Sequence, residues 1–490
     1  MMSTAAHYDI VVIGSGPAGQ KAAVQAAKAG RRVAIIEQDA TPGGACVRHG
    51  TIPSKTLRET TLVLSSFRRR SGDVLTVPLP ENLKVESLMT RLDDVVRAHQ
   101  RYITNQLERN GVDLVHGRAR FVSPTELEAT LVSGTHLRVS SSTIVIAAGS
   151  RPRTPPEIPV DHEAILDSDS ILSLVYLPRS LTVLGAGVIA VEYASTFAAL
   201  GVAVTMIDKA ARPVAFLEAE LTDRFVAHFE RMGGRFFGNA RVRSVRTDGL
   251  SVETTLESGE SIVSDKMLCA LGRVAAIERL NVAAAGLAVN ERGLLSVDEH
   301  CRTAVPHIYA VGDVIGPPAL AASAMEQGRR AVCHALGIDP GSPPEHTPVG
   351  IYTIPEMASV GLSEPEAQKR HGRITVGRAR FDEVARGHIV GGRDGLLKIV
   401  ADGEGRQLLG VQIVGESATE LIHLAQMTLA LGGTVDCFVE NIFNFPTLAE
   451  AYRIAALDIA GQRAGVSRTS ARKLLGRAGA HAWVPTTQHA

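Results

Sequence analysis

The chain is poor in cysteine, in long apolar runs and in net charge. Only 5 of its 490 residues are cysteines, and none lies near another in sequence, which excludes a disulfide-stapled fold. No apolar run reaches the roughly eighteen residues of a membrane-spanning helix, and the N-terminus lacks a secretory signal pattern. Fifty-one basic residues balance 51 acidic ones, which argues against a broad face for nucleic acid. These absences predict a cytoplasmic protein whose partners include neither nucleic acid nor a membrane.

The composition itself is that of an ordinary globular protein. Hydrophobic residues make up 45% of the chain and charged residues 21%, which is too apolar for a disordered protein. At roughly 150 residues per domain, the length predicts about three domains.

The strongest feature is an internal repeat. Residues 10–37 and residues 181–208 each read as a strand, a tight glycine turn, a helix and a second strand. In both copies an acidic residue, Glu37 or Asp208, follows the first glycine by 23 positions. This is the dinucleotide-binding fingerprint in its full context. The sequence therefore predicts two Rossmann-like units, each with its own dinucleotide.

The glycine positions of the two copies serve separable purposes. The first allows the tight turn, the second lets a pyrophosphate approach the backbone, and the third keeps the helix close to the strand. The helix N-terminus then faces the phosphates with its partial positive charge, and the acidic residue accepts hydrogen bonds from a ribose. The predicted residues are Gly14, Gly16, Gly19 and Glu37 in the first copy and Gly185, Gly187, Ala190 and Asp208 in the second.

The rest of the chain adds strands and a further domain. Beyond a proline-rich linker at 340–348, alternating runs and two helical stretches predict an α+β domain. Strands are predicted at 143–149, 266–273, 308–313, 396–400 and 407–414, and helices at 321–336 and near 417–431 and 447–462.

Longer motifs carry a resemblance to a known family. Residues 43–46 (Gly-Gly-Ala-Cys) lead into residues 52–55 (Ile-Pro-Ser-Lys), and residues 445–450 (Phe-Pro-Thr-Leu-Ala-Glu) lie near the C-terminus. Together with the two fingerprints and the strand that ends on Asp313, they occur in one order from about residue 7 to about residue 463. In this order the chain resembles the flavoprotein pyridine nucleotide–disulfide oxidoreductases, which include glutathione reductase, dihydrolipoamide dehydrogenase and mercuric reductase.

The resemblance implies an α/β fold of the glutathione-reductase kind. It implies FAD in the first copy of the repeat, NAD(H) or NADP(H) in the second, and a C-terminal α+β dimerisation domain that forms a homodimer, with larger assemblies left open. The implied boundaries are 1–155 and 279–345 for the FAD-binding domain, 156–278 for the NAD(P)-binding domain and 346–465 for the dimerisation domain. Residues 466–490 are basic and are predicted to be a flexible tail or a docking segment.

The resemblance also assigns residues to the site. Lys55 and Glu192 are expected to pair beside the reactive ring as the catalytic pair, and no metal site is expected. Lys209 and Arg212 follow Asp208 and are expected to reach a nucleotide phosphate. The remaining FAD contacts implied are Gly43, Gly44, Ala45, Cys46, Gly117, Gly149, Gly312, Asp313 and Ala321, and the remaining nucleotide contact is Gly272.

Two departures from the family pattern remove one chemical step. Cys46 keeps the first position of the family's redox cysteine pair, but Thr51 occupies the second, and a hydroxyl cannot form a disulfide. Phe445 stands where the family has an acid–base histidine, although Glu450 remains. Both losses argue against a disulfide substrate. In this respect the chain resembles the subgroup of soluble pyridine nucleotide transhydrogenases.

The resemblance thus implies ping-pong hydride transfer between NADPH and NAD⁺ through FAD. Asp208 favours NAD(H), because a carboxylate repels a 2′-phosphate, so the nucleotide preference stays open. The alternatives are an NADH-dependent diaphorase or flavin reductase, and a dihydrolipoamide dehydrogenase-like enzyme in which Cys46 is redox-active. A non-catalytic flavin redox sensor is a more remote alternative.

Overall fold

The computed structural model describes residues 3–71 and 85–463. The chain divides into two compact units, one of Met1–Val214 with Phe229–Pro343 and one of Ala215–His228 with Pro344–Ala490. The three-domain boundaries expected from the sequence stay a prediction, and the basic tail at 466–490 lies outside the described residues. Within the described ranges, no helix is both long enough and apolar enough to cross a membrane.

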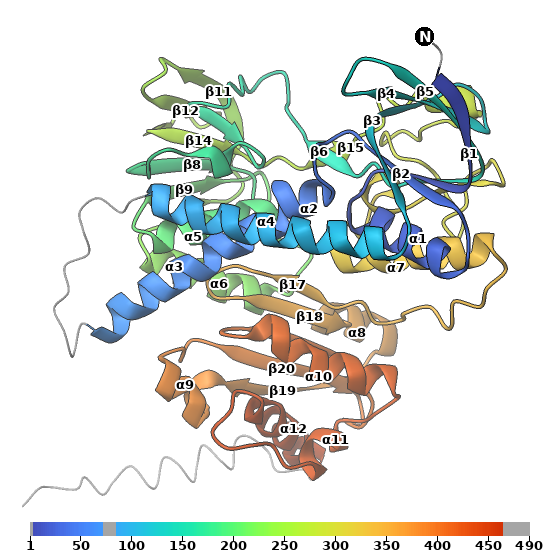
Figure 1. Ribbon diagram of the computed structural model, residues 1–490. Helices are drawn as coiled ribbons and strands as arrows, with labels where there is room; N and C mark the ends of the chain where they lie inside the picture. The colour runs from blue at the N-terminus through green and yellow to red at the C-terminus, as the bar shows by residue number, and fades with distance from the viewer. Residues whose placement is uncertain (1–2, 72–84, 464–490) are drawn as a thin grey trace, which may run out of the picture. The chain divides into compact units, whose positions relative to one another are not determined.

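The first unit contains a mainly parallel sheet, several of whose strands are labelled in Figure 1. Its strands run in the order β3–β2–β1–β5–β16, and β4 joins the C-terminal half of β3 to the N-terminal half of β5 by antiparallel pairing. Every residue of β2 is buried, as expected for a strand covered on both faces. The bounds are β1 (Ser3–Ile13), β2 (Val33–Glu37), β3 (Asp113–Phe121), β4 (Glu126–Leu131), β5 (His136–Ile146) and β16 (Ile308–Ala310).

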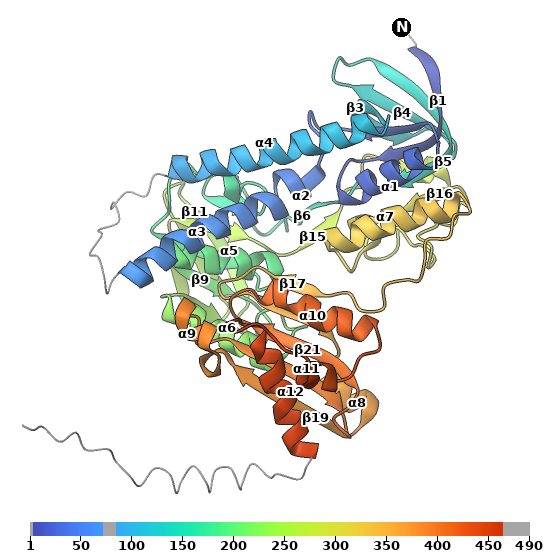
Figure 2. The ribbon, with the colours of Figure 1, turned by 60° about the horizontal axis from the view of Figure 1, so that its bottom comes forward.

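Helices α1 and α7 lie side by side in this unit (Figure 2). Helix α1 is rich in alanine and begins with Pro17, whose fixed φ suits a first helical position. Gly328 in α7 lets the two helices approach, because a Cβ there would collide with the carbonyl oxygen of Ala18. The helices of this part are α1 (Pro17–Lys28), α2 (Gly44–Arg48), α3 (Thr51–Ser71), α4 (Val85–Arg109) and α7 (Ala321–Ala335), with 3₁₀ segments η2 (Val282–Ala285) and η3 (Gly312–Ile315).

A second parallel sheet belongs to the same unit and runs in the order β10–β9–β8–β14–β7. A three-stranded antiparallel sheet, β11–β12–β13, follows it, and the short strands β6 and β15 pair with each other. The bounds are β6 (Ser150–Pro152), β7 (Ile165–Asp167), η1 (Ile171–Ser173), β8 (Ser180–Leu184), α5 (Val188–Ala199), β9 (Ala203–Ile207), β10 (Arg235–Phe237), β11 (Val242–Thr247), β12 (Val252–Leu256), β13 (Ser261–Ser264), β14 (Lys266–Cys269) and β15 (Arg273–Ala275).

The predicted internal repeat is confirmed. Strand β1, helix α1 and strand β2 form the first copy, and β8, α5 and β9 form the second. In each copy the two strands are parallel neighbours, and the acidic residue stands at or directly after the end of the second strand. The predicted α/β class with two Rossmann-like sheets is therefore correct.

An antiparallel sheet forms the second unit, as the predicted α+β domain requires. Its strands run in the order β17–β18–β21–β20–β19. Phe381 and Tyr452 are fully buried, and the rings of Phe438 and Tyr452 lie 4.8 Å apart, so aromatic side chains fill the core beside the sheet. The strands are β17 (Val349–Ile351), β18 (Met357–Gly361), β19 (Ile374–Arg380), β20 (Leu396–Asp402) and β21 (Leu408–Val414).

The helices of the second unit begin and end at recognisable signals. Helix α8 starts with a capping box in which Ser363 and Glu366 each bond the other's backbone N–H. Helix α6 begins in this unit, whereas its residues from Phe229 onward belong to the first. The helical segments are α6 (Ala219–Arg231), α8 (Glu364–His371), η4 (Phe381–Glu383), α9 (Ala385–Val390), α10 (Ala418–Ala430), α11 (Asp436–Glu440) and α12 (Glu450–Arg463).

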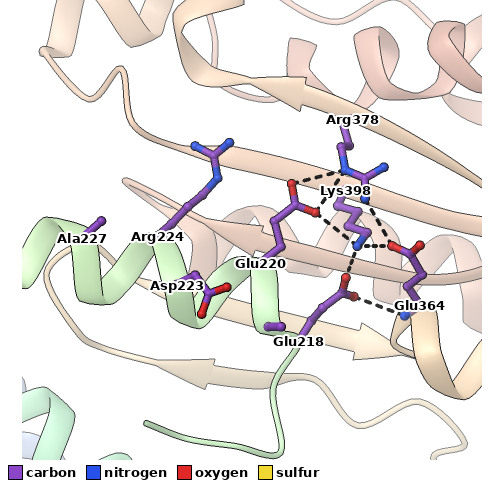
Figure 3. Close-up of a pocket in the computed structure, with 9 residues that line it drawn as sticks. Glu218, Glu220, Asp223, Arg224, Ala227, Glu364, Arg378 and Lys398 are labelled. Atoms are coloured by element: carbon purple, nitrogen blue, oxygen red, sulfur yellow. Dashed lines mark hydrogen bonds and ion pairs between the residues drawn. The ribbon is translucent and has the colours of Figure 1, made fainter. Parts of the chain in front are cut away.

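A buried ionic cluster joins the start of α6 to the sheet inside the second unit (Figure 3). The amine of Lys398 in β20 is only 2% exposed and pairs with Glu218, Glu220 and Glu364. Arg378 in β19 pairs with Glu220 at 3.1 Å and with Glu364 at 3.2 Å. Burial lowers the pKa of Lys398 to about 8, and the surrounding carboxylates favour its charged form. With its charges paired among themselves, the cluster serves to hold α6 on the sheet.

Candidate functional site

The first glycine turn is closed by a carboxylate. Glu37 at the end of β2 accepts hydrogen bonds from the N–H of Ser15 at 2.8 Å and from the Ser15 hydroxyl at 2.6 Å. Its other oxygen accepts the N–H of Asp39 at 2.9 Å. The Ser15 hydroxyl also accepts the N–H of Gly43, which ties residues 43–46 to the turn. These hydrogen bonds fix the turn, so no further side chain is needed to hold the start of α1 in position.

The space at the second glycine fits a phosphate. A Cβ added to Gly14 would lie 2.5 Å from the carbonyl oxygen of Ala147, so that position is packed. A Cβ added to Gly16 would meet nothing within 4 Å. Gly16 is also the N-cap of α1 and supplies no side-chain cap for the free N–H groups of the first turn. The open cradle and the free donors are what a pyrophosphate requires.

The second turn repeats this arrangement around Asp208. Its Oδ2 accepts the N–H of Ala186 at 2.8 Å, and its Oδ1 accepts the N–H of Ala210 at 2.6 Å. A Cβ on Gly185 would lie 2.6 Å from a backbone oxygen, whereas one on Gly187 would meet nothing within 4 Å. The second turn therefore also leaves open space at the N-terminus of α5, where Ala190 takes the third position with its methyl group fully buried.

Two basic residues stand just beyond Asp208. Lys209 and Arg212 are both exposed. Neither makes a hydrogen bond or ion pair with another residue in the described part of the chain. The Asp208 carboxylate accepts two backbone N–H groups, one on each oxygen. Lys209 and Arg212 are therefore accessible to a nucleotide phosphate beside a carboxylate that is already hydrogen-bonded.

Lys55 and Glu192 come together although 137 positions separate them in sequence. The Lys55 amine on α3 donates to Glu192 Oε2 on α5 at 2.6 Å. The pair is largely removed from solvent, with side-chain exposures of 24% and 10%. The expected pairing is therefore present in the structure, and its catalytic role stays a prediction.

One cysteine, Cys46, lies on α2 in the Gly-Gly-Ala-Cys segment of residues 43–46. Burial raises the pKa of the Cys46 thiol, and the neighbouring Thr51 hydroxyl and the positive charge of Lys55 partly oppose this. All five cysteines of the chain are free. A single thiol beside a hydroxyl lacks the second sulfur that dithiol–disulfide exchange requires.

The C-terminal motif lacks a proton donor or acceptor at its first position. Phe445 in the second unit is 75% exposed. Glu450, at the start of α12, accepts the N–H of Thr447, which precedes the helix, at 3.3 Å. The carboxylate that would orient a histidine is used here to hold the turn that leads into the helix.

Residues 43–46 pack tightly on the first turn. A Cβ on Gly44 would lie 2.8 Å from the Cα of Gly16, and Gly43 has a φ of 134° that suits glycine. Ala45 and Cys46 follow on α2. Gly117 lies in β3, where a Cβ would lie 2.8 Å from the carbonyl oxygen of Thr130, so close strand packing alone explains that glycine.

Asp313 and its neighbours lie at the C-terminal end of β16. The Gly312 N–H donates to the Gln327 side chain at 2.8 Å, and Asp313 Oδ2 accepts the Ser150 hydroxyl at 2.5 Å. Helix α7 begins at Ala321, as predicted. Gly149 and Gly272, at the ends of two other strands, have φ values of 71° and 102°. The structure thus gathers the predicted residues around the ends of parallel strands, where ligands of such folds bind.

Sequence reasoning missed several polar residues of this region. Ser15 closes the first turn, and Ser150 and Arg273 contact Asp313 directly or through one another. Arg48 on α2 pairs with Asp39. A signal existed for Arg273, which directly follows the predicted Gly272, whereas the isolated serines follow no spacing rule.

No cluster of three or more histidine, cysteine or acidic side chains suited to a metal ion occurs within residues 3–71 and 85–463. The candidate site is instead built from backbone N–H groups, two carboxylate-closed turns and one buried ion pair. Such a set can bind dinucleotides and adjust a bound ring electrostatically.

Comparison with known proteins agrees with this geometry. A soluble pyridine nucleotide transhydrogenase of Mycobacterium tuberculosis is 44% identical over 453 residues, which cover 92% of this chain and 97% of that protein. One of Marinobacter nauticus is 41% identical over 458 residues and 98% of its length.

Solved structures share the fold. The HOCl-induced flavoprotein disulfide reductase RclA of Escherichia coli matches with a TM-score of 0.83 and 27% identity, over 92% of this chain and 99% of that one. LpdA of Mycobacterium tuberculosis matches with a TM-score of 0.85 and 28% identity, over the same shares of the two chains.

Family models cover most of the chain. The model of pyridine nucleotide-disulphide oxidoreductases matches residues 8–328, and the model of their dimerisation domain matches residues 347–456. Because the first match alone spans more than half of the sequence, and the relatives agree over nine-tenths of it, the chain belongs to the pyridine nucleotide-disulphide oxidoreductase family.

Proposed function

We propose that this enzyme transfers a hydride between NADPH and NAD⁺ through bound FAD, in a ping-pong cycle that yields NADP⁺ and NADH. One observation carries the proposal. Thr51 stands where a second redox cysteine would be needed, while both dinucleotide turns are closed by their carboxylates. The electron acceptor of such a site is then a second nicotinamide nucleotide. Relatives named soluble pyridine nucleotide transhydrogenase support the same reading.

Family membership implies a flavin and a nicotinamide nucleotide, and we propose FAD at the first turn. When bound, FAD supplies a ring that can take a hydride from one nicotinamide and return it to another. The cradle at Gly16 would bind the pyrophosphate, and Glu37 would accept ribose hydroxyls with its remaining lone pairs. The Lys55 ammonium, held in place by Glu192, would stabilise negative charge on the ring of the bound FAD.

The second turn would receive both nicotinamide nucleotides in succession. Asp208 would meet a ribose, and Lys209 and Arg212 would supply positive charge for the 2′-phosphate of NADP(H). Gly187 leaves room for the pyrophosphate. One slot that accepts either nucleotide is the requirement of a ping-pong exchange.

We further propose that the chain works as a cytoplasmic homodimer. On α10 the side chains of Leu424, Met427 and Leu431 follow one another at helical spacing and are exposed in the single chain. They lie inside the region that matches the family's dimerisation domain. An exposed apolar stripe of this kind marks an interface, and a second copy is the occupant that the family implies.

An anaerobic half-reaction tests the hydride transfer. NADPH is mixed with the purified protein, and the loss of the flavin absorbance near 450 nm is followed before NAD⁺ is added. The proposal expects bleaching by NADPH and recovery on addition of NAD⁺, with NADH formed in equal amount. Reduced flavin that NAD⁺ fails to reoxidise would contradict it.

Parallel assays separate the other candidate functions. Bleaching by NADH without bleaching by NADPH would indicate an NADH-dependent diaphorase, the function that Asp208 by itself favours. Turnover with lipoamide or oxidised glutathione would indicate a thiol pathway through Cys46. Bound FAD without turnover of any acceptor would indicate a redox sensor.

A further inference from the structure

Arg273 occupies a junction within the first unit. It begins strand β15, which pairs with β6, and these two short strands link the part of the unit that holds the first turn to the part that holds the second. Its side chain is about three-quarters buried. Buried arginines are found where their several donors are met, so the partners of this guanidinium indicate its purpose.

The guanidinium grips Ser150 with two donors. Its Nε donates to the Ser150 hydroxyl at 2.8 Å, and its Nη2 donates to the Ser150 carbonyl oxygen at 2.8 Å. On the other side, Nη1 donates to the Ser168 hydroxyl at 3.2 Å and to Asp169 at 3.3 Å. One side chain therefore joins β6 to the segment after β7.

Ser150 links Arg273 to Asp313 through its hydroxyl group. A serine hydroxyl has one hydrogen, and the Arg273 donor occupies an oxygen lone pair, so the hydrogen is free to point elsewhere. It points to Asp313 Oδ2, at 2.5 Å. The second oxygen of Asp313, Oδ1, accepts no hydrogen bond from the described residues. Arg273 and Ser150 thus hold one oxygen of this carboxylate and leave the other for a ligand hydroxyl.

The two gripping residues directly follow two predicted site glycines. Ser150 follows Gly149, whose carbonyl oxygen accepts the N–H of Ala276 at 3.0 Å. Arg273 follows Gly272, whose carbonyl oxygen accepts the N–H of Arg153 at 3.0 Å. The backbone at each glycine is therefore tied to the opposite strand of the β6–β15 pair.

We propose that Arg273 is a positioning residue that acts through Ser150 to fix the Asp313 carboxylate, so that its second oxygen faces a hydroxyl of FAD bound in the first site. The inference rests on the proposed function, because it requires FAD in the first site. Two parallel donors on one serine need the planar fork of arginine, which the single ammonium of lysine cannot reproduce.

Two serines on the same guanidinium provide a matched test. Ser150→Ala and Ser168→Ala each remove one hydroxyl that accepts from Arg273, but Ser150 alone reaches Asp313. FAD dissociation from the holoenzyme and the flavin midpoint potential are measured for both variants. We expect Ser150→Ala to weaken FAD binding about tenfold and to shift the potential, because a hydrogen bond to a carboxylate is lost. Ser168→Ala should change neither quantity, and Ser150→Thr should restore both.

Arg273→Lys gives a second route to the same answer. It keeps the positive charge but removes the planar guanidinium, so FAD binding should weaken as much as in Ser150→Ala. The double variant, which combines Ser150→Ala with Arg273→Lys, should bind FAD as tightly as the weaker-binding of the two single variants. Equal effects of the two serine variants, unchanged FAD retention in Ser150→Ala, or additive losses in the double variant would overturn the inference. A wild-type protein that retains no FAD would overturn the proposed function as well. The results for the variants bear only on the role of Arg273.

Discussion

At the scale of single residues, the two carboxylates that end the fingerprints do more than meet a ribose. Glu37 and Asp208 each use both oxygens to bind backbone N–H groups of their own turn. We therefore expect the nucleotide preference of the second site to depend on two opposing charges. They are the Asp208 carboxylate, which disfavours a 2′-phosphate, and the exposed basic side chains of Lys209 and Arg212, which favour one.

Replacing Asp208 by asparagine should shift this balance toward NADPH. Asp208→Asn removes a negative charge near the proposed 2′-phosphate position, which is worth roughly 1 kcal/mol at a partly exposed site and about fivefold in preference. The ratio of kcat/KM for NADPH to that for NADH measures it.

Arg212→Ala is the matched variant of opposite sign. It should raise KM for NADPH and leave KM for NADH unchanged, because the guanidinium would meet only the 2′-phosphate. If both substitutions leave the NADPH to NADH ratio as it was, neither residue selects the nucleotide.

Cys46 should behave as a buried thiol in its pH dependence. Burial raises its pKa, so its thiolate fraction at pH 8 should lie below that of a free cysteine, whose pKa is about 8.5. Alkylation by iodoacetamide, followed on the Cys46 peptide by mass spectrometry, should still accelerate above pH 9.

Glutathione alkylated under the same conditions is the reference for this profile. Because the profile is compared by its midpoint, slow access to the buried sulfur does not affect the conclusion. A rate for Cys46 that is already constant at pH 7 would reveal a stabilised thiolate and reopen the thiol pathway.

At the scale of elements, the structure relies on side chains that join segments remote in sequence. The Lys55–Glu192 pair joins α3 to α5, and the Lys398 cluster joins the start of α6 to β20. Lys398 and Glu218 are both nearly inaccessible to solvent. Removing one member of a buried pair leaves the other charge without a partner, which costs more than the loss of the pair itself.

We therefore expect Lys398→Met to destabilise the second unit by about 3 kcal/mol or more. Faster amide hydrogen exchange in peptides from residues 215–228 and 396–402 measures the effect locally, which avoids a two-state assumption for a chain of two units. Glu220→Gln is the control, because Glu220 is 31% exposed and exposed pairs contribute less than about 1 kcal/mol. Similar exchange in both variants would refute a buried role for the cluster.

At the scale of the whole molecule, the exposed apolar surface of the second unit is expected to be buried in an interface. Leu431 is 79% exposed and continues the stripe on α10, and Ile442 and Phe445 are exposed nearby in sequence. Stable interfaces bury about 800 Å² on each partner, which calls for several such residues together. A homodimer through this unit meets that need.

Leu431→Glu should weaken the proposed dimer, because each copy would bring a charge into the apolar contact. Light scattering after size-exclusion chromatography should show a lower mass at micromolar concentration than for the wild type. Leu250→Glu is the control, since Leu250 is 86% exposed on a turn of the first unit. A dimer that survives Leu431→Glu, or one that Leu250→Glu disrupts equally, would place the interface elsewhere.

The amino-acid sequence determined the fold class, the repeat and most elements of the chain. Local patterns suffice for these, because glycine turns, buried strand runs and helix periodicity act over short distances. The predicted helix at 321–336 is α7, and the predicted strand at 396–400 is β20. The chemical losses at Thr51 and Phe445 were equally visible, since each depends on which atoms a single side chain carries.

Tertiary structure decided which polar groups meet. The link from Arg273 through Ser150 to Asp313 spans three segments, and the pair of Lys398 with Glu218 spans 180 positions. No local pattern encodes such contacts, because they arise only when distant strands end at the same edge of a sheet or pack against the same helix. The sequence therefore indicates a dinucleotide-binding fold, because its motifs are local, and only the folded chain shows which side chains from distant segments contact one another.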